Sequence, residues 1–254
     1  MVIINISGEL NSVLECIGGM CFKAESILNL CMDGFMKHKV DSIDEARKVS
    51  QTIRNEGNEV RKLLIDKAKE AVVNREWTKS MMSIIGSIEM AVTGLDSVLQ
   101  HVNEVKKLLS DKAKEADINR EWIKSMISII GSIEMAVTGL DSVLQHVRVQ
   151  ITEGILFSDK AISEISFLFK ETLDIVKTAG GALVTKNEVF MKYVVDKYKN
   201  LDGIVSGYEE KHEYRLIKGT CQAQASQVYS NILDAIMTVG WHTKQALLKL
   251  FEAD

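Results

Sequence analysis

Carboxylates at helical spacing are the side chains of this sequence best suited to chemistry. The segment Glu56–Arg61 recurs as Glu210–Arg215, and each segment has two acids three residues apart with an arginine two residues further on. One more acid follows each segment, Glu89 in the first case and Asp234 in the second. Acids three or four residues apart lie on one face of a helix, and two antiparallel helices with such faces supply the oxygen ligands that hard cations prefer.

These acids predict a metal site, and the open alternative is a charged helix face that is exposed to solvent. The candidate ligands are Glu56, Glu59, Glu89, Glu210, Glu213 and Asp234. The solvent-exposed face stays open as an alternative because a charged helix face needs no ligand to be stable in water.

Other chemistry finds little support in the residues. The sequence contains no GxSxG, no HExxH and no glycine-rich phosphate loop after a strand, so no enzyme activity is predicted. Glu209 and His212 form one Glu-x-x-His, whereas di-iron bundles need two, and the pair is interpreted as solvated. The four cysteines match no metal spacing and are expected to be reduced, partly buried thiols: Cys16, Cys21, Cys31 and Cys221.

Composition narrows the class of protein. The 254 residues include no proline, 46 % are hydrophobic and the formal net charge is −4. This mixture argues against a disordered chain and against an all-β fold. A mildly acidic chain with scattered lysines and arginines makes nucleic-acid binding unexpected. No membrane span and no secretory signal are predicted, so a cytoplasmic location is expected.

The elements that must position the acids are dominated by a tandem repeat with a period of 45 residues. Residues 58–102 and 103–147 differ at only six positions. Two of the differences exchange an apolar residue for a polar one, Ile65 for Ser110 and Val72 for Asp117, so the copies are expected to lie in different environments. A solenoid needs about three or more repeats, so two near-identical copies indicate a tandem duplication, natural or engineered.

Apolar residues at helical spacing predict an all-α protein with about seven long helices. Asn74 and the segment 117–119 are expected to separate helices, and the stretch 75–116 is expected to be continuous. The expected helices are 8–37, 43–73, 75–116, 120–152, 156–183, 186–218 and 222–252.

The last third of the chain resembles the PhoU-like phosphate-uptake regulators, which consist of two similar three-helix bundles in tandem. The resemblance is carried by Tyr208–Cys221 and the following Gln224–Asp234, and in the first half by Asp44–Val49 and Glu56–Arg61. It implies two tandem antiparallel helical bundles, with one extra helix from the duplicated segment. The N-terminal bundle would span 1–152, including both repeats, and the C-terminal three-helix bundle would span 153–254.

The resemblance implies a non-catalytic regulator that acts through contacts with a phosphate transporter or sensor component. The family's metal motif has an aspartate four residues after an acid, but threonine stands there in this chain: Thr93, Thr138 and Thr238. The cofactor therefore stays unknown, with a divalent ion or an iron, zinc or nickel ion as the candidate. The alternatives are a metal-binding helical bundle and a structural or engineered scaffold that carries a sequence duplication.

The duplication also predicts self-association. Identical helices compete for one groove, so exchange of helices between two chains costs little. A homo-oligomer, with helix exchange as one route to it, is therefore expected.

Overall fold

The protein is all-α wherever the structure describes it. The computed structural model describes the backbone of residues 6–91, 96–219 and 221–252, and side chains at 12–67, 69, 79, 122–219 and 221–252. Six helices and no strands lie in these ranges, which confirms the all-α class. The helices are α1 (Ile6–Lys37), α2 (Val40–Ala91), α3 (Asp96–Thr152), α4 (Asp159–Thr185), α5 (Glu188–Ile217) and α6 (Ala223–Phe251).

The chain forms two compact units. The first consists of the residues up to Val60 together with Ser128–Glu252, and the second consists of Arg61–Ile127. The predicted boundary between residues 152 and 153 is a different division of the chain and stays a prediction.

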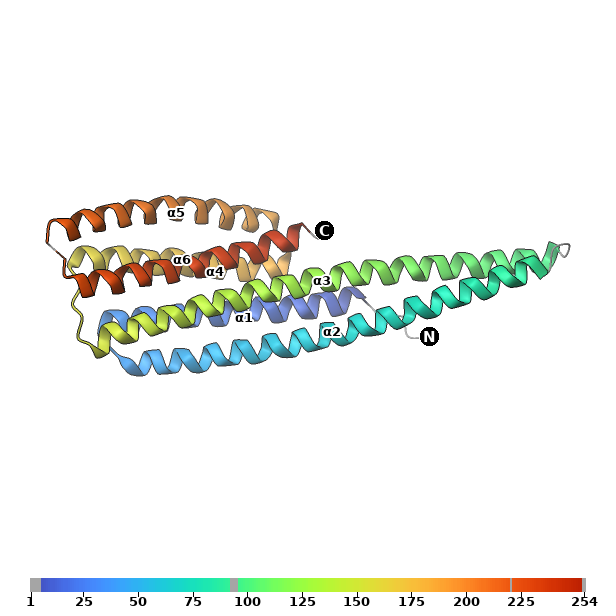
Figure 1. Ribbon diagram of the computed structural model, residues 1–254, viewed down its shortest axis with the longest axis horizontal. Coiled ribbons are helices and arrows are strands. Elements are labelled where there is room, and N and C mark those ends of the chain that lie inside the picture. The colour runs from blue at the N-terminus through green and yellow to red at the C-terminus, as the bar shows by residue number, and fades with distance from the viewer. Residues whose placement is uncertain (1–5, 92–95, 220, 253–254) are drawn as a thin grey trace. The chain divides into compact units, whose positions relative to one another are not determined.

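The first unit is a helical bundle in which α4 contacts α1, α5 and α6 (Figure 1). Its core is made of the apolar stripes that the periodicity predicts, such as Ile17, Leu28 and Phe169, each less than 2 % exposed. Two ion pairs tie α2 to α3, between Arg54 and Asp141 and between Asp44 and Arg148. Burial of the apolar stripes is the main stabilising term in this unit.

Local signals mark the starts of α4 and α5 and the end of α5. The Ser158 hydroxyl accepts a hydrogen bond from the backbone N–H of Ala161 and caps α4. The side chain of Asn187 accepts bonds from the N–H groups of Val189 and Phe190 and caps α5. These caps and the positive φ of 69° at Gly219 explain why the expected ends lie within about three residues of the observed ones.

The expectation of seven helices is wrong in the repeat region. Asn74 lies inside α2, and residues 117–119 lie inside α3. The helix expected to be continuous over 75–116 includes residues 92–95, which lie outside the described residues; α2 is described as far as Ala91 and α3 from Asp96. Asparagine is a weak stop signal, and helical continuity on both sides outweighs it here.

The second repeat copy, not the first, fills the bundle. Residues 128–147 belong to the first unit, whereas the identical residues 83–102 belong to the second unit. The sequence that follows each copy explains this choice. Arg148 pairs with Asp44, and the buried Gln150 lies 3.5 Å from the carbonyl of Ile155. The first copy has asparagine and valine at the corresponding positions, so it cannot form either contact.

One stretch meets a length-and-composition criterion for crossing a membrane. Within the described ranges this is Trp122–Thr152 of α3, and 56 % of its most apolar window is buried inside the protein. Core helices of bundles meet the same criterion, so this stretch is weak support for a membrane span.

Candidate functional site

The predicted acids of the first bundle lie near α1. Lys23 of α1 binds both carboxylate oxygens of Glu56, with Nζ–O distances of 2.8 and 2.9 Å. Glu59 is exposed. Burial raises the pKa of the nearby Cys16 thiol, and the negative charges of Glu56 and Glu59 raise it further. The structure therefore brings Glu56 and Glu59 close to one thiol and one ammonium group.

The side chain of Glu89 lies outside the described residues, but its duplicate in the second copy is described. Glu134 lies against α2, since a Cβ atom built at Gly57 would be 3.3 Å from its Oε1 atom. The acid that accompanies Glu56 in the bundle is therefore Glu134. Glu134 is not among the ligands that the sequence predicts.

The predicted acids of the second bundle are all on the surface. Glu210 and Glu213 of α5 and Asp234 of α6 are exposed. Across the described side chains, no group of three or more histidine, cysteine, aspartate or glutamate residues is arranged to hold a metal ion. The metal site stays a prediction from the sequence, and the described geometry adds no support to it.

Asp234 lines a groove between α3 and α6. The groove has a volume of about 320 Å³, and its polar lining consists of Thr138, Ser142, His146, Asn231, Asp234 and Thr238. Thr138 and Thr238, two of the three threonines that follow an acid by four residues, therefore lie in the same groove. Each hydroxyl donates to the carbonyl four residues earlier in its own helix, at 3.0 Å for Thr138 and 2.8 Å for Thr238. Burial lowers the pKa of His146, although the charge of Asp234 opposes this shift.

A glycine allows α3 and α6 to approach closely beside this groove. A Cβ atom at Gly139 would lie 3.0 Å from Cγ2 of Val239 and 3.3 Å from the carbonyl oxygen of Ala235. These distances are shorter than ordinary van der Waals contact. The side chain of any other residue would push the two helices apart, so Gly139 sets the width of the groove.

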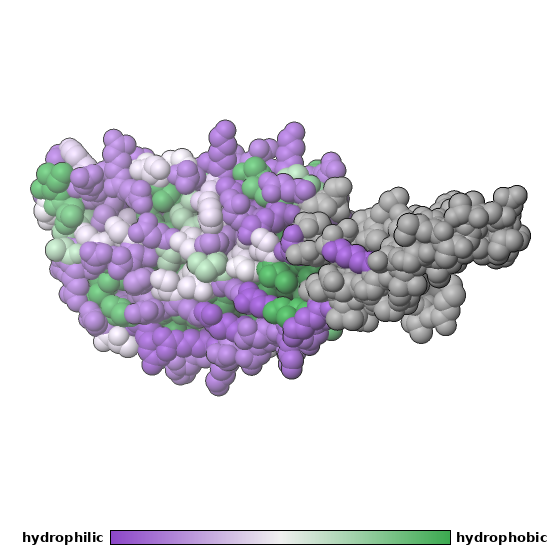
Figure 2. All heavy atoms as spheres, turned by 45° about the vertical axis from the view of Figure 1, so that its right-hand side comes forward, coloured by the Kyte–Doolittle hydropathy of each residue, from purple (hydrophilic) through white to green (hydrophobic). Residues whose placement is uncertain are grey.

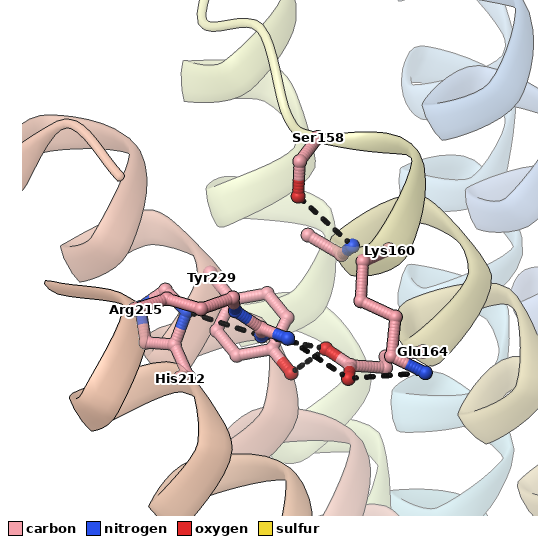
Figure 3. Close-up of polar contacts among 7 residues, drawn as sticks. Ser158, Lys160, Glu164, His212, Arg215 and Tyr229 are labelled. Carbon is pink, nitrogen blue, oxygen red and sulfur yellow. Dashed lines mark hydrogen bonds and ion pairs between the residues drawn. The ribbon is translucent and has the colours of Figure 1, made fainter. Parts of the chain in front are cut away.

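The most strongly coupled polar cluster lies elsewhere in the first unit, where α4, α5 and α6 meet (Figure 3). Its centre is the carboxylate of Glu164, which is 1 % exposed. Arg215 donates to both carboxylate oxygens, at 3.2 and 2.9 Å, and the Tyr229 hydroxyl donates at 2.7 Å. Nζ of Lys160 lies 3.8 Å from the same carboxylate. The buried charge is thus paired and hydrogen-bonded, as a buried charge must be.

Electrostatics fix the charge states in this cluster. Burial alone would raise the pKa of Glu164, but the hydrogen bonds from Arg215 and Tyr229 outweigh burial and lower it. Burial and the negative Glu164 raise the pKa of the Tyr229 phenol. Glu164 is therefore ionised and Tyr229 is neutral at pH 7.

His212 joins the cluster from α5, which contradicts its interpretation as a solvated residue. The ring is 7 % exposed and stacks on Tyr229 with a centroid distance of 4.3 Å. Nδ1 of the ring lies 3.5 Å from Nη2 of Arg215, and Nε2 has no hydrogen-bond partner among the described residues. Burial and the neighbouring Arg215 lower the pKa of His212, so the ring is neutral at pH 7.

Sequence reasoning found Arg215 but missed its partners, Glu164 and Tyr229. A signal for Glu164 was present, because it interrupts the apolar stripe of Ala161, Ile165 and Leu168 on the buried face of α4. An acid within an apolar stripe indicates a buried ion pair, since a buried carboxylate without a partner would be very unfavourable.

The cluster and the cysteines show no arrangement for catalysis in the described part of the chain. The carboxylate of Glu164 is fully engaged by its donors. Burial raises the pKa of the Cys21 thiol to about 12, so it is protonated and unreactive at pH 7. The described geometry is that of a helical bundle in which this polar cluster joins three helices. No family model matches this chain, and no curated protein matches it in sequence.

Proposed function

We propose that this chain is a non-catalytic, PhoU-like regulator of phosphate uptake that acts through protein–protein contacts. The fold proposed with this function is two tandem three-helix bundles, α1–α3 and α4–α6, with α2 and α3 lengthened by the duplication. The residue pattern of Tyr208–Cys221 supports the family, and an all-helical chain without a described catalytic group is consistent with it.

The observation that carries a binding role is the exposure of α5. Only four of its 30 residues are buried, against 12 in α4 and 14 in α6. Seven of the 15 large apolar side chains that are exposed in the described chain lie on α5. Val189 is 73 % exposed and Ile217 is 78 % exposed. Concentrated apolar exposure marks surfaces that bind other proteins.

In the face shown in Figure 2, the described surface is mainly hydrophilic, and hydrophobic residues form separate patches. A partner that covers an apolar side chain on such a surface has little desolvation cost, because no polar group loses its water there. The partner is proposed to be a component of a phosphate transporter or its sensor, which binds the exposed side of α5.

Co-purification tests this proposal. The tagged chain is crosslinked in its own cells, and the captured proteins are identified by mass spectrometry against a tag-only control. A transporter or sensor component should be enriched with the native chain and lost with the variant Val189→Ser/Ile217→Ser. The matched control is Leu156→Ser, which removes an equally exposed residue (80 %) from the segment between α3 and α4. Enrichment that contains no transporter or sensor component, or that the α5 variant leaves unchanged, contradicts the proposal.

A further inference from the structure

The segment of α3 that packs into the first unit, residues 128–147, occurs twice in the chain. Residues 83–102 have the same sequence, position for position. Nine residues of the packed segment are apolar and at most 3 % exposed, among them Ile133 and Leu144. Each of these nine therefore has an identical counterpart in the first copy. The place that residues 128–147 fill in the bundle is termed the docking position.

The polar contacts at the docking position do not distinguish the two copies either. The Ser50 hydroxyl of α2 donates to Asp141 at 2.5 Å, and the ammonium group of Lys249 in α6 donates to the Ser132 hydroxyl at 2.8 Å. The first copy has the same residue types at the two corresponding positions, Asp96 and Ser87. The bundle therefore presents one set of partners to two identical sequences.

The polar residues that follow the identical stretch favour the second copy only weakly. Arg148 forms an ion pair with Asp44, but the two side chains are 36 % and 49 % exposed. An exposed pair of this kind shifts an equilibrium by about fivefold or less. Gln150 is buried, but its Oε1 atom has no hydrogen-bond partner among the described residues. Its counterpart Val105 has no polar side-chain atom to leave unpaired, so this exchange costs little.

Apolar residues at the edges of the docking position add to the preference for the second copy. Three of them correspond to polar residues of the first copy: Ile123 to Thr78, Val149 to Glu104 and Ile151 to Lys106. Ile123 is 5 % exposed, and Val149 and Ile151 are half-buried. The first copy would therefore lose contacts at the edges of the docking position and none inside it. This preference agrees with the structure, in which the second copy is docked.

The chain is long enough to dock either copy. Glu134 lies against Gly57, so α2 and the docked segment are neighbours. Residues 61–127 join them now, and the 22 residues 61–82 would join α2 to the first copy. Neighbouring helices lie about 8–10 Å apart, and a connection of this length spans several times that distance. After the first copy, residues 103–158 would lead to α4, where residues 148–158 are sufficient now.

We propose that the docking position accepts either copy of its own chain. When the second copy leaves, residues 83–102 replace residues 128–147, and a segment of 45 residues moves from the connection between α2 and α3 to the connection between α3 and α4. The nine buried apolar side chains are replaced by identical ones, so the exchange alters the connections of the bundle and not the composition of its core. This inference is independent of the proposed function.

Substitutions confined to one copy test the proposal on the full chain. The second-copy variant, Ile133→Asp/Leu144→Asp, puts two carboxylates at buried positions and makes docking of that copy very unfavourable. Hydrogen exchange with mass spectrometry follows the backbone amides of α6, which contacts α3 at Gly139. These amides should stay protected in the variant because the first copy docks instead, and light scattering should give the mass of one chain.

The matched controls are the corresponding first-copy variant, Ile88→Asp/Leu99→Asp, and the chain with all four substitutions. The amides of α6 should stay protected in the first-copy variant and lose their protection in the four-substituted chain, which has no intact copy. Protection that persists in the four-substituted chain would overturn the proposal, because the first copy would then not be what keeps the bundle folded. A folded second-copy variant found only as a dimer would overturn it as well, because the docked helix would then come from another chain.

A further variant covers the case in which the neighbouring residues keep the first copy out of the bundle. It gives the first copy the five residues that follow the second: Asn103→Arg/Glu104→Val/Val105→Gln/Lys106→Ile/Lys107→Thr. Protection of α6 that returns when these changes are added to the second-copy variant supports the proposal and assigns the preference to the neighbouring residues. Loss of protection both with and without these changes overturns the proposal.

Discussion

Arg215 donates hydrogen bonds to both carboxylate oxygens of Glu164, at 3.2 and 2.9 Å, and thereby joins α5 to α4 inside the bundle. The Tyr229 hydroxyl adds a third donor from α6. A single buried carboxylate thus connects three helices. Of α4, α5 and α6, α5 has the fewest buried residues, so it depends on this connection.

Removing the guanidinium of Arg215 should lower the stability of the folded protein. The variant Arg215→Met leaves Glu164 buried without its charged partner, and we expect the free energy of unfolding to fall by about 3 kcal/mol or more. The control Arg54→Met breaks the ion pair with Asp141, whose side chains are each 37 % exposed, and should cost at most about 1 kcal/mol. Urea unfolding followed by circular dichroism measures both. Equal losses in the two variants would show that the Glu164 pair is not the stronger connection.

Glu164 should also make stability depend on pH at acid values. Its pKa in the folded protein is lowered from the ordinary 4.5, so its contribution is present above that value and is lost as the pH falls through the lowered pKa. The variant Glu164→Gln should therefore be less stable at pH 7 and lose less stability between pH 5 and pH 3. Unfolding in urea across this range provides the comparison, with the exposed Glu188→Gln as control. If Glu164→Gln and the native chain give parallel curves, the carboxylate does not titrate as stated.

Replacing either of two glycines of α3 by alanine should change the stability of the protein, but in opposite directions. At Gly139 an added Cβ atom would lie 3.0 Å from Val239 and 3.3 Å from the carbonyl of Ala235, so Gly139→Ala should destabilise the protein by about 1–3 kcal/mol. At Gly131 an added Cβ atom meets nothing within 4 Å, so Gly131→Ala should gain up to about 1 kcal/mol of helix stability.

Thermal unfolding of the two alanine variants measures the difference directly. The melting temperature should fall for Gly139→Ala and rise for Gly131→Ala. A rise for Gly139→Ala would mean that α3 and α6 separate without cost, and the groove of Thr138 and Thr238 would then not have a fixed width.

The sequence predicts the single-copy parts of this fold well and the duplicated part poorly. The ends of α4 and α5 follow from side chains such as Ser158 and Asn187, which act within one turn of helix. The duplicated part has no such signal at the right place. Residues 128–147 belong to the first unit, whereas residues 83–91 and 96–102, which are the same residues in the first copy, belong to the second. Identical local sequence cannot determine which copy joins the bundle, so long-range packing decides.

The residues of the candidate site could also be predicted only in part from the sequence. Spacing along the chain identified Arg215 and the surface acids, because helical periodicity places residues on a face. It could not pair Arg215 with Glu164, which is 51 residues away. Spacing also could not predict that His212 is buried, because its exposure depends on how α5 packs on α6.

Phosphate uptake in living cells tests the central claim most directly. The gene for this chain is deleted, and uptake of radioactive phosphate is measured at high external phosphate, with the native chain or Val189→Ser/Ile217→Ser returned on a plasmid. A regulator that acts through α5 predicts altered uptake in the deletion strain, restored by the native chain and by Leu156→Ser but not by the α5 variant. Uptake that is the same in the deletion and parent strains would contradict the proposed function.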